Sequence, residues 1–216
     1  MIDGITIKID KNQKLLLVLL LLSIILTPLF LSISFLVQLD HQLFLQINSY
    51  YQSSPWDPIL LIITHMGSLE FLFLLDITLF VIGKRKMGTY LLILLVSYSI
   101  IGYGLKFIID RPRPYLEYAE ISYLGSGFKA SFPSGHSLGA AAFSTLLYVR
   151  NNPYLKFYLP LAFLVFFTRV FLGMHFPFDV LSGMWIGLII GILVGNLNLE
   201  NIHDCTPQWI RRMKST

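Results

Sequence analysis

The 216-residue chain contains a single cysteine, Cys205, and few charged residues, which make up 13% of its length. One cysteine excludes an intramolecular disulfide, so cysteine usage does not indicate a cellular compartment. Charged residues are scarce while hydrophobic residues reach 55%, and this balance excludes an ordinary soluble domain of this length. The composition therefore places the protein in the membrane class.

Charge is absent altogether from residues 15–37, and this absence defines the first hydrophobic segment. A run of 23 residues is long enough to cross a bilayer, whose hydrocarbon core is about 30 Å thick. A cleaved signal peptide is the alternative, but the run is too long and no small-x-small cleavage site follows it. We interpret the segment as an uncleaved membrane anchor.

Five further apolar segments follow, and together with the first they predict an all-α membrane bundle of six transmembrane helices. They cover approximately residues 59–83, 87–109, 134–149, 157–172 and 177–197. Helices are expected because unpaired backbone amides are too costly in lipid. His65, Gly67 and Glu70 indicate an interfacial turn near the start of the second segment. We expect one domain over residues 1–216, with a six-span core at 15–197 and short tails at 1–14 and 198–216.

The basic residues predict an orientation for this bundle. If six helices alternate in direction, eleven of the sixteen basic residues fall on one side: Lys8, Lys11, Lys14, Lys84, Arg85, Lys86, Arg150, Lys156, Arg211, Arg212 and Lys214. The positive-inside rule makes that side cytoplasmic, so both termini are expected in the cytoplasm. The same rule explains the basic excess, so we expect no nucleic-acid partner.

The first outer connection, residues 38–57, has no lysine or arginine. It instead carries Leu39, Leu43, Ile47 and Tyr51 at steps of four. This spacing predicts a short amphipathic helix that lies on the membrane surface.

The remaining five basic residues fall on the outer face, against the rule: Lys106, Arg111, Arg113, Lys129 and Arg169. Basic residues at the ends of spans require a local anionic partner. The alternating topology brings three of these cations to the same depth as residues 133–136 and 175–179. Because the orientation was predicted without using the histidines, their convergence on one face is an independent agreement.

This set of side chains suits a phosphate. Lys106, Arg113 and Arg169 supply positive charge, and the arginines can grip phosphate oxygens with two donors each. Ser134 and Gly135 stand where the fourth span begins, and free backbone N–H groups and the helix dipole attract an anion there.

Two histidines near a phosphate indicate phosphoryl transfer. His175 and Asp179 are four residues apart and share a helix face, so the carboxylate is expected to accept a hydrogen bond from one ring nitrogen while the other nitrogen attacks. His136 is expected to protonate the leaving oxygen. The reaction would pass through a phosphohistidine that water then hydrolyses. We expect no metal and no other cofactor, because the three cations carry the transition-state charge.

Three motifs carry a resemblance to a known family. They are "KFIIDRPRP" at residues 106–114, "PSGH" at 133–136 and "TRVFLGMHFPFD" at 168–179. The chain resembles the type 2 phosphatidic acid phosphatase (PAP2) family, whose motifs are Lys-x6-Arg-Pro, Pro-Ser-Gly-His and Ser-Arg-x5-His-x3-Asp; only Thr168 departs, standing for the serine. The resemblance implies that His175 is the nucleophile, Asp179 its orienting partner and His136 the acid. It also implies phosphate binding by Lys106, Arg113, Ser134, Gly135 and Arg169.

We therefore expect a lipid phosphate phosphatase in the cell membrane whose active site faces the exterior or periplasm. Undecaprenyl diphosphate and phosphatidylglycerol phosphate are the favoured substrates, because the chain has the compact length of the bacterial members. A lipid A 1-phosphatase and a lipid phosphotransferase stay open as alternatives. A non-catalytic transporter or binder of anionic headgroups also stays open, but it would need the cations without the two histidines.

Three charged residues are expected to lie outside the site. Arg111 is interpreted as pairing with Asp110 or with a lipid headgroup, and Lys129 as solvated. Asp76, in the second segment, is interpreted as making a hydrogen bond that packs helices together.

Overall fold

The computed structural model describes residues 11–51, 53, 55–125, 129–199 and 202–205. Residues 1–10 and 206–216, which form most of the two predicted tails, lie outside this part of the chain. In the described residues the regular structure is entirely α-helical, which confirms the predicted class. The helices are α1 (Lys11–Ser32), α2 (Ser34–Asn48), α3 (Asp57–His65), α4 (Leu69–Val81), α5 (Arg85–Ile109), α6 (Pro114–Glu117), α7 (Gly135–Val149), α8 (Leu155–Phe171) and α9 (Pro177–Gly195).

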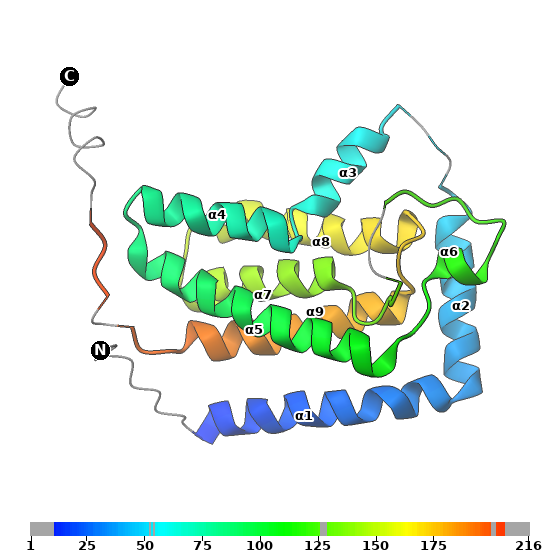
Figure 1. Cartoon of the computed structure of the whole chain (residues 1–216), viewed down its shortest axis with the longest axis horizontal. Helices are drawn as coiled ribbons and strands as arrows, with labels where there is room; N and C mark the ends of the chain where they lie inside the picture. The colour runs from blue at the N-terminus through cyan, green and yellow to red at the C-terminus, as the bar shows by residue number, and fades with distance from the viewer. Residues whose placement is uncertain (1–10, 52, 54, 126–128, 200–201, 206–216) are drawn as a thin grey trace.

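The helices pack into a bundle with α7 at its centre (Figure 1). Helix α7 packs against α4, α5, α8 and α9, and every residue from 137 to 147 is buried. Helices α1, α4, α5, α7, α8 and α9 run roughly along one direction, and α2 crosses them at one end of the bundle (Figure 1). That end holds the α5–α7 connection and the turn between α8 and α9.

Glycines on α9 allow α7 and α9 to approach closely. A Cβ atom added at Gly183 would lie 2.6 Å from the carbonyl oxygen of Ser134, and one added at Gly187 would collide with the carbonyl oxygen of Leu138. Small residues spaced four apart permit this kind of backbone contact in membrane bundles. The contact places the N-terminus of α7 beside the first turns of α9, where the predicted catalytic motifs lie.

The predicted segments match the helices closely from α5 onward. Helices α5, α7, α8 and α9 begin and end within two residues of the predicted limits. The second segment is two helices, α3 and α4, that meet at an angle of 59°. The break lies at residues 66–68, where Ser68 caps α4 by accepting a hydrogen bond from the backbone N–H of Phe71. The turn expected near Gly67 is therefore present.

The first segment is wrong at its C-terminal end. Helix α1 ends at Ser32 rather than Val37, because Ile33 adopts an extended backbone (φ −89°, ψ 102°) and a new helix, α2, begins at Ser34. A helix is thus present where one was expected within residues 38–57, but it begins earlier, and its place on the membrane surface stays a prediction. Its packed face consists of Asp40, Phe44 and Asn48, whereas Leu39 and Leu43 are each 41% exposed. Sequence spacing identified an apolar stripe on this helix, but not the face with Asp40, Phe44 and Asn48 that packs against the rest of the bundle.

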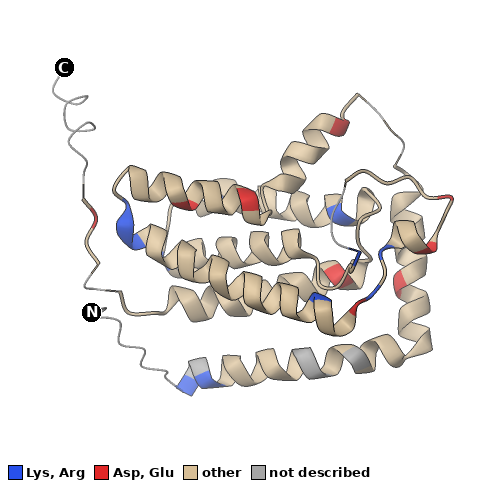
Figure 2. Cartoon of the chain, viewed as in Figure 1, with Lys and Arg blue, Asp and Glu red and all other residues tan. Residues whose placement is uncertain are grey.

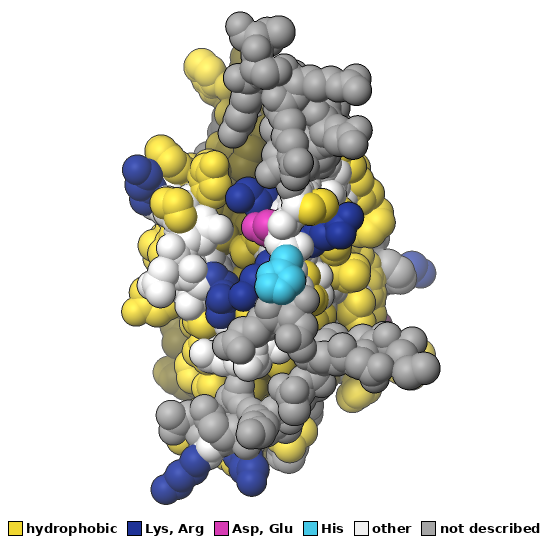
Figure 3. All heavy atoms as spheres, turned by 90° about the vertical axis from the view of Figure 1, so that its left-hand side faces the viewer, with side chains coloured by type: hydrophobic (Ala, Val, Ile, Leu, Met, Phe, Trp, Pro, Cys, Tyr) yellow, Lys and Arg dark blue, Asp and Glu magenta, His cyan; other side chains and the backbone are white. Residues whose placement is uncertain are grey.

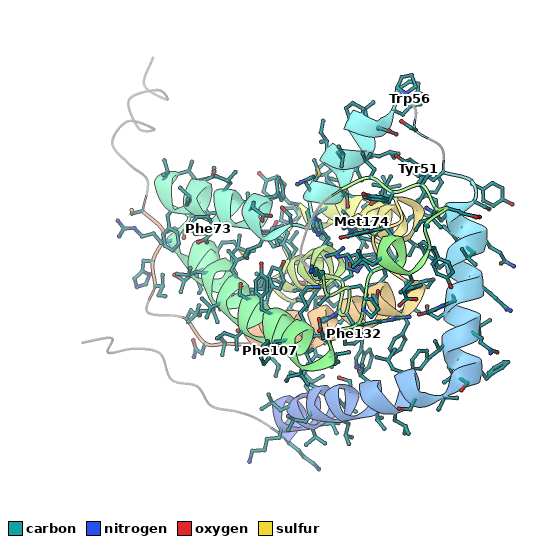
Figure 4. All side chains as sticks on the ribbon, turned by 45° about the vertical axis from the view of Figure 1, so that its right-hand side comes forward. Tyr51, Trp56, Phe73, Phe107, Phe132 and Met174 are labelled. Atoms are coloured by element: carbon teal, nitrogen blue, oxygen red, sulfur yellow. The ribbon has the colours of Figure 1, made fainter. Side chains whose placement is uncertain are left out.

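By length and composition, α5 and α9 are each able to cross a membrane, and the bent α3–α4 pair adds a third span if it is counted as one. Large apolar side chains cover the outside of the bundle. Phe73 on α4 and Phe107 on α5 point outward, and Phe107 is 89% exposed; Phe132 and Met174 lie inside (Figure 4). Exposed aromatic and aliphatic side chains of this size are typical of a lipid-facing surface. The count of six spans stays a prediction.

Basic residues lie at both ends of the bundle. One group occupies the start of α1 and the α4–α5 turn, and another lies at the end of α5, in the loop that leads into α6 and in the last turn of α8 (Figure 2). Figure 3 looks onto the first end, where basic side chains stand among apolar ones. Of the eleven residues assigned to the cytoplasmic side, Lys8, Arg211, Arg212 and Lys214 lie outside the described residues.

Candidate active site

A cavity of about 510 Å³ opens at the end of the bundle where α5, α7 and the α8–α9 turn meet. Five residues expected in the site line it: Lys106, Arg113, Gly135, His136 and His175. Its remaining lining comes from α3, α4 and α5: His65, Leu69, Glu70, Tyr98, Gly102 and Tyr103. The other three expected residues, Ser134, Arg169 and Asp179, are buried, with exposures of 0, 3 and 0%. The tertiary structure thus brings the three motifs together.

His175 is buried, with 1% exposure, in the turn between α8 and α9. Its Nε2 atom lies 3.3 Å from Nη1 of Arg113. A guanidinium can only donate, so this contact requires a lone pair on Nε2 and places the ring proton on Nδ1. Burial, and then the positive charges of Arg113, Arg169 and Lys106, hold the pKa of His175 well below its ordinary range. The ring is therefore a neutral imidazole whose Nε2 lone pair points to Arg113 at the cavity wall.

Asp179 lies behind His175, but the two do not form the expected hydrogen bond. Nδ1 of His175 and Oδ2 of Asp179 are 3.7 Å apart, and Nδ1 has no hydrogen-bond partner. The carboxylate instead accepts from the Ser131 hydroxyl at 2.8 Å, the Phe176 backbone N–H at 3.0 Å and the Arg111 guanidinium at 2.8 Å. These donors hold Asp179 in place, within less than 1 Å of the geometry that a hydrogen bond to His175 requires.

Lys106 stands in the last turn of α5, and its ammonium group holds the loop that leads into α7. Its Nζ atom donates to the carbonyl oxygens of Ala130, Ser131 and Pro133 at 3.1, 3.3 and 2.9 Å. These contacts engage all three donors of the ammonium group. Lys106 therefore fixes the position of the α7 N-terminus and brings its positive charge to the cavity wall.

Arg169 is buried in the last turn of α8. Its Nη1 atom donates to Oγ1 of Thr64 at 2.8 Å, and its Nε atom has no hydrogen-bond partner. Such a buried donor is costly to leave unpaired. Arg113 donates to the carbonyl oxygen of Met174 at 3.0 Å, which holds its guanidinium beside His175.

Ser134 is the N-cap of α7. Its Oγ atom accepts hydrogen bonds from the Ser137 hydroxyl at 2.9 Å and from the Ser137 backbone N–H at 3.5 Å, and its own backbone N–H donates to the Asp179 carbonyl at 3.0 Å. Gly135 and His136 follow in the first turn, where backbone N–H groups lack intrahelical acceptors. Free backbone N–H groups at a helix N-terminus are able to bind an anion, and the anion site at the start of α7 stays a prediction of the Pro-Ser-Gly-His motif.

Sequence reasoning missed three residues that fix this site: Arg111, Asp40 and Ser131. Arg111 was expected to pair with Asp110 or a headgroup, and that expectation is wrong, because it bridges Asp40 and Asp179 in the interior at 2.7 and 2.8 Å. No spacing in the sequence connects Asp40 with the motifs. The one available signal was the position of Arg111 directly before Pro112, which favours an extended backbone at Arg111 and places it two residues from Arg113.

The other charged residues behave in two ways. Lys129 is exposed, in agreement with its interpretation as solvated. Asp76 is 3% exposed, and its Oδ1 atom has no hydrogen-bond partner, so the expected helix-packing bond is not made through that oxygen. Among the described residues, no three side chains of His, Cys, Asp or Glu are grouped in a way that could hold a metal ion.

Comparison with known proteins gives a consistent picture. Residues 87–202 match the model of the PAP2 superfamily. The chain is 31% identical over 161 residues to undecaprenyl-diphosphatase BcrC of Bacillus subtilis, covering 72% of this chain and 82% of that protein. It is 32% identical over 156 residues to phosphatidylglycerophosphatase B of the same organism, covering 65% and 74%.

A solved structure shares the fold. It is the crystal structure of a transmembrane PAP2-type phosphatidylglycerolphosphate phosphatase from Bacillus subtilis, with a TM-score of 0.67 and 25% sequence identity. The match covers 86% of this chain and 94% of that one. The residues around the cavity therefore stand in a framework shared with a membrane phosphatase.

Proposed function

This chain belongs to the PAP2 superfamily, and from that membership we propose that it removes the terminal phosphate of a membrane lipid through a phosphohistidine intermediate. The observation that carries the proposal is the neutral, buried ring of His175, whose Nε2 atom lies 3.3 Å from Nη1 of Arg113. The same cavity is lined by a cation, Lys106, and by a second histidine, His136. A nucleophile of this kind needs an adjacent cation to hold the phosphate and a group opposite to protonate the leaving oxygen.

In the first step, Nε2 of His175 forms a bond to phosphorus while the bond from phosphorus to the leaving oxygen breaks. His136 transfers its proton to that oxygen, and Asp179 stabilises the imidazolium that His175 becomes. In the second step His136 takes a proton from water, the water oxygen bonds to phosphorus, and the phosphorus–nitrogen bond breaks.

The phosphate is held by the surrounding donors. Arg113, Lys106 and Arg169 supply positive charge, and Ser134 and the N-terminus of α7, including Gly135, supply hydrogen bonds to the phosphate oxygens. Fixed donors of this kind favour the transition state because they need no reorganisation as charge develops.

Undecaprenyl diphosphate and phosphatidylglycerol phosphate are the substrates that we favour. The names of the two Bacillus subtilis relatives point to these two lipids. In the proposed topology six helices cross the cell membrane, both termini are cytoplasmic, and the cavity opens at the extracytoplasmic leaflet. A headgroup phosphate at that interface reaches His175 while its lipid chains stay in the bilayer.

The decisive experiment measures phosphate release by the purified protein from phosphatidylglycerol phosphate, undecaprenyl diphosphate and phosphatidic acid. Release into water identifies a hydrolase, whereas transfer to a second lipid, seen by thin-layer chromatography, identifies a phosphotransferase. If the protein releases and transfers no phosphate from any of these lipids, the proposed function is wrong.

Turnover is expected to be independent of metal ions, because Lys106, Arg113 and Arg169 provide the charge that a metal would otherwise supply. Activity should persist in EDTA, and orthovanadate should inhibit by occupying the phosphate site as a trigonal-bipyramidal analogue. The measurement is the rate of phosphate release with and without each reagent. A loss of activity in EDTA that Mg²⁺ restores would contradict this expectation.

The proposed topology predicts a labelling pattern. Arg85 and Lys129 are exposed and lie on opposite sides of the proposed membrane. In a background with Cys205 replaced by serine, an impermeant maleimide added to intact cells should label Lys129→Cys and not Arg85→Cys. Permeabilised cells serve as the control, because both variants should then be labelled. The opposite pattern in intact cells would invert the orientation.

A further inference from the structure

We propose that Arg111 and Asp40 are positioning residues that hold the Asp179 carboxylate in register with His175. This inference rests on the proposed function, because it assigns the two residues a part in the histidine chemistry. Neither residue lines the cavity, so neither is placed to touch the substrate. They act through Asp179.

Arg111 joins two buried carboxylates with one guanidinium group. Its Nη1 atom donates to Oδ1 of Asp179 at 2.8 Å and its Nη2 atom to Oδ2 of Asp40 at 2.7 Å. The exposures of Arg111, Asp40 and Asp179 are 7, 4 and 0%. A buried charge that loses its partner is strongly destabilised, so each member of this group depends on the others. Burial lowers the pKa of Arg111, but the two carboxylates raise it, and the net result is a pKa above the ordinary value.

Two further contacts fix the direction of the guanidinium. Its central carbon lies 4.1 Å from the ring centre of Phe176, the residue next to His175. The second oxygen of Asp40, Oδ1, accepts the backbone N–H of Phe178 at 2.8 Å in the first turn of α9. Asp40 is thus tied to α9 directly and also through Arg111. Rotation of Asp179 would break the short charged hydrogen bond to Arg111.

The charge of this group suits the reaction. One guanidinium and two carboxylates carry a net charge of −1, and the His175 ring gains one positive charge when Nε2 bonds to phosphorus. This negative group of Arg111, Asp40 and Asp179 lies on the Nδ1 side of the ring, opposite the phosphate. It therefore stabilises the imidazolium, while the phosphate stays next to its cations on the Nε2 side. Arg111 also balances one of the carboxylates, so that two negative charges do not face the ring unopposed.

Asp40 lies outside the part of the chain that matches the family model. It belongs to α2, whereas the matched part covers residues 87–202. Helix α2, which crosses the end of the bundle, therefore contributes to the catalytic framework as well as covering it (Figure 1).

The test compares Arg111→Met, Arg111→Lys, Asp40→Asn and the double variant Arg111→Met/Asp40→Asn in the full-length protein in detergent. The substrates are phosphatidylglycerol phosphate and undecaprenyl diphosphate. Arg111→Met should lower kcat about 10- to 100-fold, by analogy with the loss of a hydrogen-bond partner that orients a metal-binding side chain, while KM and the inhibition constant of orthovanadate stay nearly constant. Arg111→Lys should recover part of kcat, because it keeps the charge but cannot bridge both carboxylates.

Two features separate positioning from a merely structural role. The double variant should be no slower than Arg111→Met alone, because residues that act as a unit are not additive. The rate of phosphohistidine formation in a single turnover should fall with kcat. Arg150→Met is the matched control: Arg150 also stacks on a ring, Tyr90, and donates to a carbonyl, but at the opposite end of the bundle. The kcat of Arg150→Met should equal that of the unmodified protein.

The outcomes are distinguishable. If the unmodified protein is active and Arg111→Met keeps its kcat, the positioning role is wrong and the proposed function stands. An equal loss of vanadate binding would show that Arg111 holds phosphate directly, which also overturns the inference. If Arg111→Met does not fold, the same comparison is made with Arg111→Lys and Asp40→Asn. A lower kcat with a nearly constant KM supports the positioning role, and an unchanged kcat contradicts it. An unmodified protein that is inactive on every lipid phosphate overturns both proposals.

Discussion

Replacing His175 by alanine is expected to abolish hydrolysis of every lipid phosphate, whatever its leaving group. The reaction requires the Nε2 lone pair beside Arg113, and alanine has no atom that can take its place. Removal of the catalytic serine of a serine protease lowers kcat about 10⁶-fold, and we expect a loss of similar order here. Phosphate release from phosphatidylglycerol phosphate and from undecaprenyl diphosphate should therefore both fall to the background rate.

Phosphate binding should survive this change. Lys106, Arg113 and Arg169 stay in place, and each keeps contacts that do not involve the His175 side chain, such as the bond from Arg113 to the Met174 carbonyl. The variant should therefore still bind the lipid phosphate. Because it does not hydrolyse the lipid, its dissociation constant can be measured with the radiolabelled substrate. Trapping in acid and base gives the complementary result: the unmodified protein should form an acid-labile, base-stable phosphohistidine and the variant none.

His203 provides the matched control for this experiment. It is an exposed histidine in the segment after α9, and it does not line the cavity. His203→Ala should keep full activity. Residual hydrolysis by His175→Ala at more than about one hundredth of the normal rate would show that another group attacks phosphorus, since a true nucleophile contributes far more. Retention of lipid binding without any activity in the unmodified protein would favour the non-catalytic headgroup binder.

Replacing His136 by alanine is expected to affect substrates unequally. His136 lines the cavity from the first turn of α7, whereas His175 lines it from the turn between α8 and α9. A monoester such as phosphatidylglycerol phosphate expels an alkoxide, whose conjugate acid is very weak, so protonation matters greatly. A diphosphate such as undecaprenyl diphosphate expels a phosphate, which is a better leaving group and needs less help.

General acid catalysis supplies about 10²–10⁴-fold. His136→Ala should lose most of that factor on the monoester and clearly less on the diphosphate. The measurement is the ratio of kcat/KM values for the two lipids, because that ratio reports transition-state stabilisation. Single-turnover rates should accompany it, to show that chemistry rather than lipid binding limits the rate.

His65 offers a comparison within the same cavity. Its ring lies 5.9 Å from that of His136, measured between centroids, and its Nδ1 atom is 2.6 Å from the Leu61 carbonyl oxygen. That contact turns one ring nitrogen toward its own helix. His65→Ala should therefore change both substrates by the same factor. Equal losses on the two substrates for His136→Ala, with chemistry limiting, would show that His136 is not the leaving-group acid.

Particular residues show how far the sequence reaches. The limits of α5, α7, α8 and α9 follow from predominantly apolar runs whose charged residues lie near the ends, because a helix in an apolar medium needs only its own backbone partners. The convergence of Lys106, His136 and His175 follows from alternating direction, since helix ends on one side share one depth. Their spacing within the motifs also agrees with the family to which the chain belongs.

Other features depend on contacts between distant parts of the chain. The break at Ile33 divides an uncharged run, so hydropathy alone does not mark it. Arg111 meets Asp40 across 71 residues and Asp179 across 68. The Asp179 carboxylate takes its other two hydrogen bonds from the backbone N–H of Phe176, the N-cap of its own helix, and from the Ser131 hydroxyl. Such partners are set by the crossing of α2 over α9 and by the rotation of each helix about its axis.

By itself, the sequence determined the helical class, the positions of the later helices and the set of charged groups at one end of the bundle, because hydrophobic length and residue spacing are local properties. The tertiary structure decided which donors hold Asp179 and how near it comes to His175. It also decided that Arg111 turns inward rather than to the lipid. The physical reason is the cost of burying charge: once Asp40 and Asp179 are enclosed by helix packing, a cation must lie between them, and only the packed fold identifies the arginine that does so.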